Sequence, residues 1–366
     1  MKVLHVYKSF LDSSFGGVEK YIENVTISTQ PFKTEHVILC TNPNKDFYQK
    51  RKNIEIISYK RTFELSSCPV SLKMLWNFKK FAEKADIIHF QYPWPFAALF
   101  TLFTKKKCIM TYQSDIVRQK FLAWILYPLD QIFLNKMDRI IATSPNYHYI
   151  SNNLKKHTKK VSVIPIAINE KNYPSPQKNE VQKIKKKFGK FFLFIGQFRH
   201  YKNLHNLVKA TKDVKANVVL LGDGILKPEL EKLSKEYKNT NLYFIGSVNE
   251  QSKVNFLSAC LCLILPSNSK AEAFGISLLE GSMFSKPLIS CSIDTGVEFV
   301  NKHNETGLVV EPTAEELAKA MNFIATNESF SNFAGKNARK RFESVFNYDS
   351  IGGLLFNLYN DLKHKK

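Results

Sequence analysis

Short apolar runs alternate with amphipathic segments along most of the chain. In the first half, seven runs have the length and the apolar character of buried strands: residues 2–7, 36–41, 54–59, 86–91, 108–113, 139–144 and 160–166. Between them, stretches such as 17–29 and 71–84 repeat apolar residues with a helical period. Strands that alternate with helices in this way predict a mostly parallel sheet covered by helices.

A polar segment rich in proline divides the chain. Residues 169–190 (NEKNYPSPQKNEVQKIKKKFGK) predict a linker followed by a basic helix, and a second alternating set begins after them. Its apolar runs are residues 191–196, 217–222, 241–246, 260–266 and 287–292. We therefore predict an α/β protein with two doubly wound, Rossmann-like parallel-sheet domains, residues 1–168 and 169–345, that face a central cleft.

The composition is that of an ordinary globular protein, with 366 residues, 44% hydrophobic and 23% charged. The first residues show no apolar core of signal-peptide length, and the stretch 92–103 is too short and too interrupted by proline to span a bilayer. The six cysteines are scattered and form no CxxC pair, which argues against a zinc or disulfide site. We expect a cytoplasmic protein, either soluble or peripheral on a membrane.

Basic residues outnumber acidic residues by 53 to 32, which gives a formal net charge of +21. Residues 1–168 carry 25 basic and 12 acidic residues, and the remainder carries 28 and 20. This excess favours an anionic partner, such as a phosphorylated substrate or an anionic lipid surface, although a general abundance of surface lysine would give the same count. No zinc-finger spacing, RNP-type motif or Gly-Arg tail accompanies the charge, so no nucleic-acid partner is expected.

Glycine ends several of the predicted strands in the second half, at Gly196, Gly222, Gly224 and Gly246. A glycine there lets a loop turn tightly or lets the backbone approach a ligand, and any single one of them is explained as well by local structure. Their recurrence at one predicted edge of the sheet indicates a binding site at that edge.

The stretch KAEAFGISLLEGSMFSKP, residues 270–287, holds Glu272 and Glu280 with seven residues between them. Its apolar part predicts a helix whose free first-turn N–H groups would bind a phosphate. These groups belong to Gly275, Ile276 and Ser277. Two carboxylates that bracket a phosphate site suit a nucleoside diphosphate sugar, which has hydroxyls on both sides of its phosphates. Without other signals, a helix-start charge and a solvated residue would be the simpler interpretation of the two glutamates.

Two cations follow the first predicted strand of the second half. The sequence GQFRHYKN, residues 196–203, places Arg199 and Lys202 where they could neutralise a diphosphate, unless both are ordinary surface cations. The chain has no DxD motif, so a diphosphate held by a metal is not indicated. We expect the cations and the helix start to stabilise the diphosphate, with no metal or other cofactor.

SKAEAFGISLLEGS resembles the E-x7-E signature of the retaining glycosyltransferases of family 4 (group 1), which have the GT-B fold. The resemblance continues along most of the chain, in SFGGVEKYI, DIIHFQYPWP, GQFRHYKNLHNLVKA, LLGDGILKPELE and HNETGLVVEP. It is greatest to bacterial enzymes that build O-antigen, lipopolysaccharide or capsule, many of which use GDP-mannose or related donors. It implies a hexosyltransferase that moves a hexose from a nucleotide diphosphate sugar to a lipid-linked or polysaccharide acceptor. It also implies that residues 346–366 form a helix that crosses back to the first domain.

The resemblance assigns a role to individual residues. It implies that Gly16 and Gly17 form the loop that faces the donor phosphate and the acceptor, and that Arg199 and Lys202 bind the diphosphate. It also implies that Glu272 binds the donor sugar, that Glu280 binds the ribose and that Val248 lies near the base.

Three positions depart from the family's pattern. Many relatives have an arginine where this chain has Gln197, two residues before Arg199. Many also have a histidine near the transferred sugar where this chain has Gln113, which cannot act as an acid or base. The nearest titratable candidate is His89, which is explained equally well as a packed strand residue. Asn169 replaces a common aspartate, and we expect it to be structural.

The implied reaction is glycosyl transfer with retention. No carboxylate nucleophile is clearly placed, so we expect a front-face route in which the leaving phosphate oxygen helps to deprotonate the acceptor. The basic first domain and the aromatic run 121–134 suggest docking on the anionic inner face of the plasma membrane, where a lipid-linked acceptor would lie. A buried helix explains 121–134 equally well.

Two other functions stay open at this point. A sugar-nucleotide epimerase of the same fold would consume a nucleotide sugar without an acceptor. A non-catalytic, basic membrane-binding scaffold would bind vesicles without hydrolysing or transferring a donor sugar. Lys202, Glu272 and Glu280 together argue against the scaffold.

Overall fold

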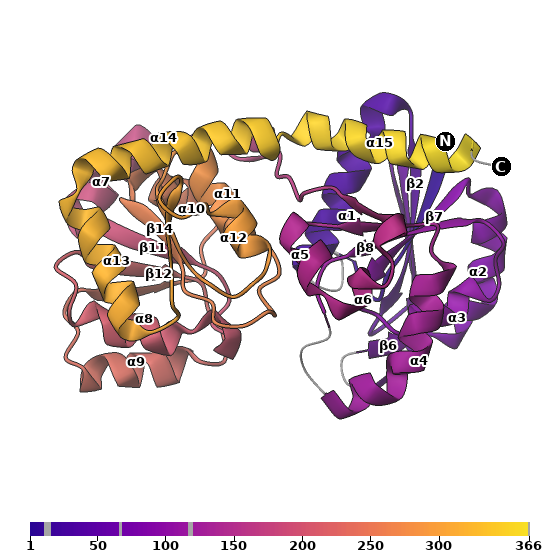
Figure 1. Ribbon diagram of the computed structural model, residues 1–366, viewed down its shortest axis with the longest axis horizontal. Helices are drawn as coiled ribbons and strands as arrows, with labels where there is room; N and C mark the ends of the chain where they lie inside the picture. Colours follow the sequence, from indigo (N-terminus) through magenta and orange to yellow (C-terminus); the bar gives the residue numbers. More distant parts are fainter. Residues whose placement is uncertain (11–15, 66–67, 116–119, 365–366) are drawn as a thin grey trace. The chain divides into compact units, whose positions relative to one another are not determined.

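The computed structural model describes residues 1–10, 16–65, 68–115 and 120–364 (Figure 1). The chain forms two compact units: unit 1 is Met1–Ala167 together with Tyr348–Lys366, and unit 2 is Ile168–Asn347. Each unit has its own mostly parallel sheet with helices packed on it, which confirms the predicted α/β fold class.

Unit 1 is built on an eight-stranded sheet with the strand order β10-β9-β8-β7-β1-β2-β4-β3. Neighbouring strands run parallel except β3 and β4, which are antiparallel. The strands are β1 (Lys2–Val6), β2 (Glu35–Asn42), β3 (Phe47–Arg51), β4 (Ile54–Lys60), β7 (Ile87–Tyr92), β8 (Lys107–Tyr112), β9 (Arg139–Ala142) and β10 (Val161–Val163). A separate antiparallel hairpin pairs β5 (Phe63–Leu65) with β6 (Cys68–Val70).

The helices of unit 1 come between these strands and at the end of the chain. They are α1 (Gly17–Ser28), α2 (Leu72–Lys84), α3 (Ala97–Thr101), α4 (Lys120–Lys136), α5 (Pro145–Ile150), α6 (Asn152–Lys155) and α15 (Tyr348–His364), with 3-10 turns at Gln30–Phe32 and Thr158–Lys160. α2 begins where the Ser71 side chain accepts a hydrogen bond from the Met74 N–H, and it buries one apolar face through Met74, Phe78 and Ala82.

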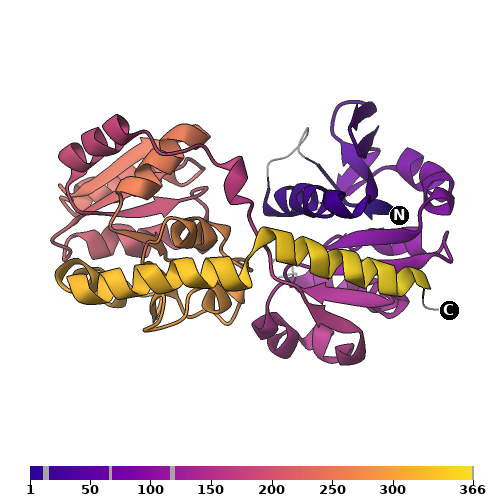
Figure 2. The same ribbon diagram turned by 90° about the horizontal axis from the view of Figure 1, so that it is seen from above.

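The last helix, α15, packs on α1 and β7 of unit 1. Both views show it running beside α1 (Figures 1 and 2). The Phe356 ring stacks on Phe32 with 4.7 Å between ring centroids. Where the helix starts, the Tyr348 hydroxyl donates to the backbone oxygen of Asn24, and the Asn24 side chain donates to the backbone oxygen of Ala167. Asn24 of α1 is therefore hydrogen-bonded to Ala167, where the chain leaves unit 1, and to Tyr348, where it returns.

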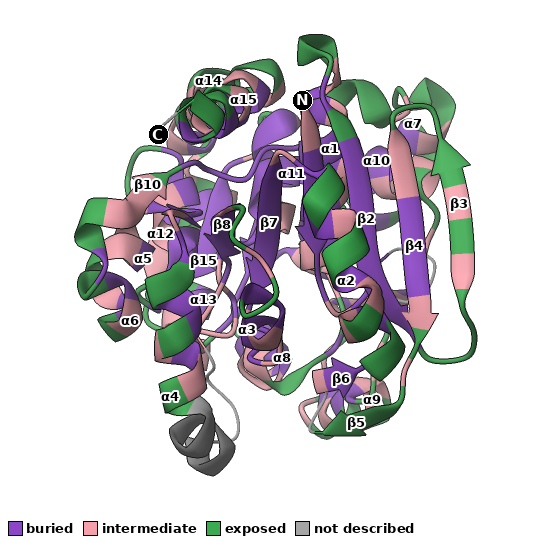
Figure 3. Ribbon diagram, turned by 90° about the vertical axis from the view of Figure 1, so that its right-hand side faces the viewer, coloured by how far each residue is buried: buried purple, intermediate pink, exposed green. Residues whose placement is uncertain are grey.

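Burial follows position in the sheet of unit 1. Figure 3 shows β2 and β7 buried along nearly their whole length, whereas the edge strand β3 is mostly exposed. The hydrophobic pattern does not predict β3, because its sequence FYQKR has no apolar run. A strand at the edge of a sheet is solvated on one side and needs no such run.

Unit 2 is built on a six-stranded, all-parallel sheet with the order β13-β12-β11-β14-β15-β16. The strands are β11 (Phe191–Ile195), β12 (Asn217–Leu221), β13 (Leu242–Gly246), β14 (Cys262–Leu265), β15 (Leu288–Cys291) and β16 (Gly307–Val310). The helices are α7 (Lys178–Phe188), α8 (Leu204–Thr211), α9 (Lys227–Glu236), α10 (Glu250–Ala259), α11 (Ile276–Met283), α12 (Gly296–Val300), α13 (Ala314–Thr326) and α14 (Glu328–Val345), with 3-10 turns at Glu170–Asn172 and His200–Lys202.

Gly196 and Gly222, which follow β11 and β12, let the ends of these two strands approach each other closely. Gly222 has φ +135°, and a Cβ built there would lie 1.9 Å from the backbone oxygen of Gly196. No larger residue fits this approach, so local structure accounts for the glycine. The strand order also places β14 directly beside β11, although the two strands are far apart in sequence. The residues that follow these two strands form the candidate site.

Candidate active site

The start of α11 has the geometry that the sequence predicts for an anion site. Gly275 precedes the helix with φ +78°, and a Cβ there would lie 2.8 Å from Leu265 and 3.0 Å from Leu278. Glycine is therefore required both by the backbone and by the close packing. The N–H groups of Ile276 and Ser277 belong to the first turn, where a helix leaves its donors without intrahelical partners.

Lys202 and Glu272 form a buried ion pair in front of this helix. The Lys202 Nζ lies 2.5 Å from Glu272 Oε2, and each residue is 9% exposed. The Ser267 hydroxyl donates to the same carboxylate oxygen at 2.9 Å. Burial has the largest effect on the pKa of Lys202 and lowers it, but the attraction of Glu272, that of Tyr201 and the hydrogen bond to Glu272 together outweigh burial, and the pKa lies above its usual value. Lys202 therefore stays charged, and the two residues to which the resemblance gave separate partners contact each other.

Arg199 is an exposed residue that comes shortly before Lys202 in the sequence. Its guanidinium Nε donates to the Gln197 side chain at 3.2 Å, and Arg199 is the residue before the 3-10 turn that carries Lys202. Gln197, which stands where many relatives have an arginine, and Arg199 thus contact each other. The exposed guanidinium is available to a ligand, whereas Lys202 is already paired with Glu272.

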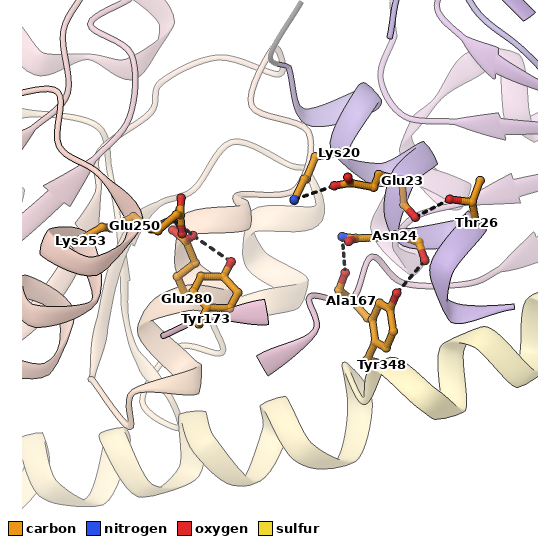
Figure 4. A network of polar contacts seen from close by, with 10 residues as sticks. All are labelled: Lys20, Glu23, Asn24, Thr26, Ala167, Tyr173, Glu250, Lys253, Glu280 and Tyr348. Atoms are coloured by element: carbon orange, nitrogen blue, oxygen red, sulfur yellow. Dashed lines mark hydrogen bonds and ion pairs between the residues drawn. The ribbon is translucent and has the colours of Figure 1, made fainter. Parts of the chain in front are cut away.

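Glu280 lies in α11 and is 6% exposed. Its Oε1 accepts a hydrogen bond from the Tyr173 hydroxyl at 3.0 Å and pairs with the Lys253 Nζ at 2.7 Å (Figure 4). Lys253 also pairs with Glu250, at 3.0 Å. The interpretation of Glu280 as a solvated residue is therefore wrong, because a buried carboxylate needs such partners. Neither Tyr173 nor Lys253 belongs to a motif, so neither could be predicted from the sequence.

Val248 lies in the connection between β13 and α10 and is half-buried. The side chain of the next residue, Asn249, accepts a hydrogen bond from the Ser252 N–H and so starts α10, the helix that carries Lys253. Val248 is thus on the same loop-and-helix segment as a partner of Glu280.

Gly16 and Gly17 begin α1 in unit 1. A Cβ on Gly16 would lie 2.4 Å from Oε2 of Glu19, whose carboxylate is buried and accepts a hydrogen bond from the Ser9 hydroxyl at 2.6 Å. The carboxylate folds back over the start of the helix, where a negative charge is favourable. Glu19 is a further buried acid that the sequence analysis did not single out. The part of the predicted loop at residues 11–15 lies outside the described residues.

The structure does not support His89 as the titratable residue of the site. The sequence analysis names it as the nearest titratable candidate, but its side chain is fully buried, and both ring nitrogens are engaged at 2.7 Å, one with the Thr111 hydroxyl and one with the Tyr359 hydroxyl. Burial, with smaller contributions from His5 and His36, lowers the pKa of His89 well below its usual value. Because β7 lies inside the sheet and α15 covers it, His89 is the packed strand residue of the alternative interpretation.

Gln113 follows β8 and is 7% exposed. Its side-chain nitrogen donates to the Gln91 side chain at 3.2 Å. Asn169 accepts a hydrogen bond from the Lys171 N–H and precedes the 3-10 turn at Glu170–Asn172, in agreement with a structural role.

Within residues 1–10, 16–65, 68–115 and 120–364, no three His, Cys, Asp or Glu side chains come together as ligands for a metal ion. None of the described helices is both long enough and apolar enough to cross a bilayer.

The chain matches two family models side by side. Residues 15–172 match the model described as Glycosyltransferase Family 4, and residues 176–341 match Glycosyl transferases group 1. O-antigen chain mannosyltransferase C of Escherichia coli is 35% identical over 373 residues, which cover 100% of both chains. D-rhamnosyltransferase WbpZ of Pseudomonas aeruginosa is 35% identical over 94% of this chain and 92% of its own.

A solved structure with the same fold is sucrose-phosphate synthase from Thermosynechococcus elongatus. It has a TM-score of 0.78 at 19% identity and covers 99% of this chain and 98% of its own. The chain therefore belongs to the group 1 glycosyltransferases of family 4, it has their GT-B fold, and it is an enzyme that transfers a sugar.

Proposed function

We propose that this enzyme transfers a hexose from a nucleotide diphosphate sugar to a lipid-linked or polysaccharide acceptor, with retention of anomeric configuration and without a metal. The observation that supports this most is the buried ion pair of Lys202 with Glu272, a residue that precedes α11 in sequence, together with Glu280 inside that helix. A cation, a helix start and two carboxylates within unit 2 match the charges and hydroxyls of such a donor.

The names of two relatives support a proposal for the sugar and the pathway. The two relatives at 35% identity are named an O-antigen chain mannosyltransferase and a D-rhamnosyltransferase. We propose a hexose donor of the same kind, GDP-mannose or a related nucleotide sugar, and a place in the synthesis of a cell-surface glycan such as O-antigen, lipopolysaccharide or capsule. Specificity for the sugar would depend on a few hydroxyl contacts, which relatives of this similarity need not share.

The ion pair suggests how the donor would be held. Lys202 would share its charge between Glu272 and a diphosphate at the first turn of α11, and the exposed Arg199 would add a second cation. Glu272, relieved of part of its attraction to Lys202, would accept hydrogen bonds from hydroxyls of the sugar. Glu280 would accept them from the ribose at the other side of the diphosphate.

The reaction would then proceed on one face of the sugar. The bond between the anomeric carbon and the diphosphate oxygen breaks, and the diphosphate leaves with that electron pair, stabilised by Lys202, Arg199 and the N–H groups of Ile276 and Ser277. The acceptor oxygen bonds to the anomeric carbon from the same face, and its proton passes to the leaving phosphate oxygen. No side chain forms a bond to the sugar, so a trapped covalent sugar on any residue would exclude this route.

Binding of nucleotides is the first test. Thermal stabilisation would be measured with GDP, UDP, ADP and dTDP in the presence of a metal chelator. We expect one diphosphate, GDP if the donor is GDP-mannose, to raise the unfolding temperature by several degrees, and the anomeric configuration of the product, followed by NMR, to match that of the donor. Stabilisation that appears only after a divalent metal is added would contradict metal independence, and no stabilisation by any diphosphate would favour the scaffold.

The acceptor would be reached at a membrane. On unit 1, the exposed residues of α2 and of the segment after α3 combine apolar and basic side chains. Trp76, Leu102 and Phe103 are 88%, 63% and 50% exposed. The surface hollow beside them is lined by residues of both segments, which include Lys79, Glu83, Lys105 and Lys106. Exposed aromatic and aliphatic tips among lysines are typical of docking on anionic lipid, so we propose a cytoplasmic enzyme that is peripheral on the inner face of the plasma membrane.

The aromatic run 121–134 contributes less to this proposal. Its Phe133 and Leu134 are fully buried in unit 1, where Phe133 packs on Phe90 with 5.2 Å between centroids. Phe133 and Leu134 thus fit the buried helix of the alternative interpretation, whereas Tyr127 and Ile132 are 42% and 47% exposed. The side chains of residues 120–126 lie outside the described part of the structure.

Vesicle sedimentation tests the docking surface. We expect the enzyme to sediment with vesicles that contain phosphatidylglycerol and not with pure phosphatidylcholine, and Trp76→Ala to reduce the bound fraction severalfold. A control with Lys185, Lys186 and Lys187 of α7 changed to Ala removes three positive charges from unit 2 and should change sedimentation little. A loss in this control with none in Trp76→Ala would mean that net charge, and not this surface, drives binding.

A further inference from the structure

Glu280 is held by donors from two other segments of unit 2. The Tyr173 hydroxyl comes from the chain just after the 3-10 turn Glu170–Asn172, and the Lys253 ammonium comes from α10. Figure 4 shows these two side chains converging on the carboxylate. Among the described residues, both donors reach the same oxygen, Oε1.

This arrangement leaves acceptor capacity on the carboxylate. An ionised carboxylate offers about four lone-pair positions on its two oxygens. Two donors at Oε1 fix the plane of the carboxylate and keep Oε2 available to further donors. Lys253 itself is charged. Burial has the largest effect on its pKa and lowers it, but the interactions with Glu280 and Glu250 together outweigh burial and raise the pKa above its usual value.

Tyr173 itself is fixed by contacts on both sides. Its ring lies 5.2 Å from the Lys253 Nζ, in a cation–π arrangement. Three residues earlier, Glu170 is bound by both terminal nitrogens of Arg339, at 2.7 and 2.9 Å, and Arg339 also donates to the backbone oxygen of Met283 at 2.6 Å. Met283 is the last residue of α11. The segment 170–173 is thus tied to α11 at Glu280 and at the end of the helix.

We propose that Tyr173 and Lys253 are positioning residues that hold the Glu280 carboxylate in the orientation in which it accepts hydrogen bonds from the ribose hydroxyls of the donor. The inference rests on the proposed function, which gives Glu280 that ligand. Tyr173, a neutral donor with a fixed ring, sets the orientation, and the Lys253 ammonium holds the same carboxylate oxygen at 2.7 Å. A pair that only stabilised the fold would affect unfolding but not the recognition of one hydroxyl.

The test compares a nucleoside diphosphate with its deoxy analogues. Binding of GDP, 2′-deoxy-GDP and 3′-deoxy-GDP would be measured by calorimetry, or of the corresponding set for whichever diphosphate stabilises the wild type most. We expect the wild type to bind at least one deoxy analogue about tenfold more weakly, as for loss of a hydrogen bond to a charged group. Tyr173→Phe should reduce this ratio severalfold and leave inorganic pyrophosphate binding unchanged.

The controls separate orientation from general effects. Tyr237 is a matched tyrosine, since it is half-buried in unit 2 and its ring also lies near a lysine, Lys212, at 5.7 Å. Tyr237→Phe should keep the wild-type ratio. Lys253→Gln should reduce the ratio at least as much as Tyr173→Phe, and Lys253→Arg should restore part of it. If Tyr173→Phe does not fold, the Lys253 pair of variants decides the question.

The possible failures are distinct. If the wild type binds the diphosphate and its deoxy analogues equally, the proposed role of Glu280 at the ribose is wrong, and with it the basis of the inference. If the wild type discriminates and Tyr173→Phe and Lys253→Gln discriminate as strongly, Glu280 binds the ribose without help from either residue and the inference is overturned.

Discussion

Each unit of the molecule has a buried polar cluster, and the two clusters differ in charge. In unit 1, His5, His36 and His89 lie on the adjacent strands β1, β2 and β7, with ring centroids 5.1 to 5.2 Å apart. His5 and His36 are hydrogen-bonded to each other at 3.0 Å, and His36 and His89 also bond to neutral hydroxyls, such as the Thr29 hydroxyl at 2.9 Å from His36. In unit 2, Glu272 and Glu280 each face a lysine.

This difference in charge and exposure favours the unit 2 cluster as the one that acts on a ligand. The histidines are 0 to 1% exposed, and α15 covers them through Tyr359, so no ligand reaches them and none needs to be charged. The carboxylates of unit 2 are 9% and 6% exposed, lie next to or inside α11, and each is paired with a lysine. A neutral network stabilises a fold, whereas fixed charges near the surface can act on a ligand.

Acid should break the unit 1 cluster, and this is the largest effect we expect. Burial lowers the pKa of His5 to about 3 and lowers those of His36 and His89 well below the usual value. Below pH about 6.5 the unfolded chain therefore binds protons that the folded chain does not, so this stability is present above that pH and is lost as pH falls. From pH 7.5 to 5.5 the loss should be about 1.4 kcal/mol for each histidine, or about 4 kcal/mol together.

Tryptophan fluorescence can measure this loss in unit 1 alone. Trp76, Trp94 and Trp124 are the three tryptophans of the chain, and all lie within Met1–Ala167. His36→Gln should reduce the change between pH 7.5 and 5.5 by about a third, as expected for one of three titrating groups. His364→Gln, at an exposed residue of α15, should not alter it. A pH dependence that is the same in all three proteins would contradict the role given to the cluster.

Removing a charge in unit 2 should abolish most of the activity. Lys202→Ala leaves Glu272 without its buried partner and the leaving diphosphate without a cation, and we expect kcat/KM to fall about 10²- to 10³-fold. Glu272→Ala should cause a similar fall. Lys183→Ala, in an exposed ion pair on α7, is the matched control and should retain activity. A fall of less than tenfold in a folded Lys202→Ala enzyme would remove Lys202 from the site.

Loss of the contact between α15 and the histidine cluster should have a smaller effect, on the stability of unit 1. Tyr359→Phe leaves one nitrogen of His89 without its buried partner, which should lower the free energy of unfolding of unit 1 by about 1–3 kcal/mol. KM for the donor should not change, because the cluster has no contact with a ligand in this interpretation. Tyr149→Phe, at a residue that is 70% exposed, is the control for loss of a tyrosine hydroxyl. A raised KM in Tyr359→Phe would show that unit 1's cluster reaches the chemistry after all.

The smallest effect should come from the far side of the proposed donor site. Glu280→Ala should raise the donor KM about tenfold with kcat nearly unchanged, since a ribose contact is made equally in the ground state and the transition state. Glu250→Ala is a close control, because Glu250 contacts the same Lys253 but has a side chain that is 64% exposed. It should have little effect on either constant. A fall in kcat alone for Glu280→Ala would place Glu280 nearer to the reacting atoms than we propose.

The hydrophobic pattern predicts the fold well where strands are buried on both faces. The runs 86–91 and 191–196 match β7 and β11 to within one residue, because the interior of a parallel sheet requires continuous apolar sequence. The pattern fails for β3, which is exposed at an edge, and for β16, whose sequence GLVV is too short to stand out from its polar surroundings.

The candidate site was predictable only where its residues form a local motif. Glu272, Gly275 and Glu280 are close in sequence, and the helix start between them follows from local rules. Tyr173 and Lys253 are 107 and 27 residues from Glu280 and carry no signal of their own. His89 shows the opposite error, since a histidine looks titratable in any sequence until its burial is known.

Order and spacing along the chain were enough to predict the two alternating sets of strands and helices, the division near residue 168, and the family. Which charges meet depends instead on how the strands are arranged in space. Lys202 contacts Glu272 because β11 and β14 are neighbours in the sheet, although 70 residues separate the two side chains. His89 became structural because a helix from the other end of the chain covers it. Burial and ion pairing depend on distance in space, which spacing in sequence does not fix.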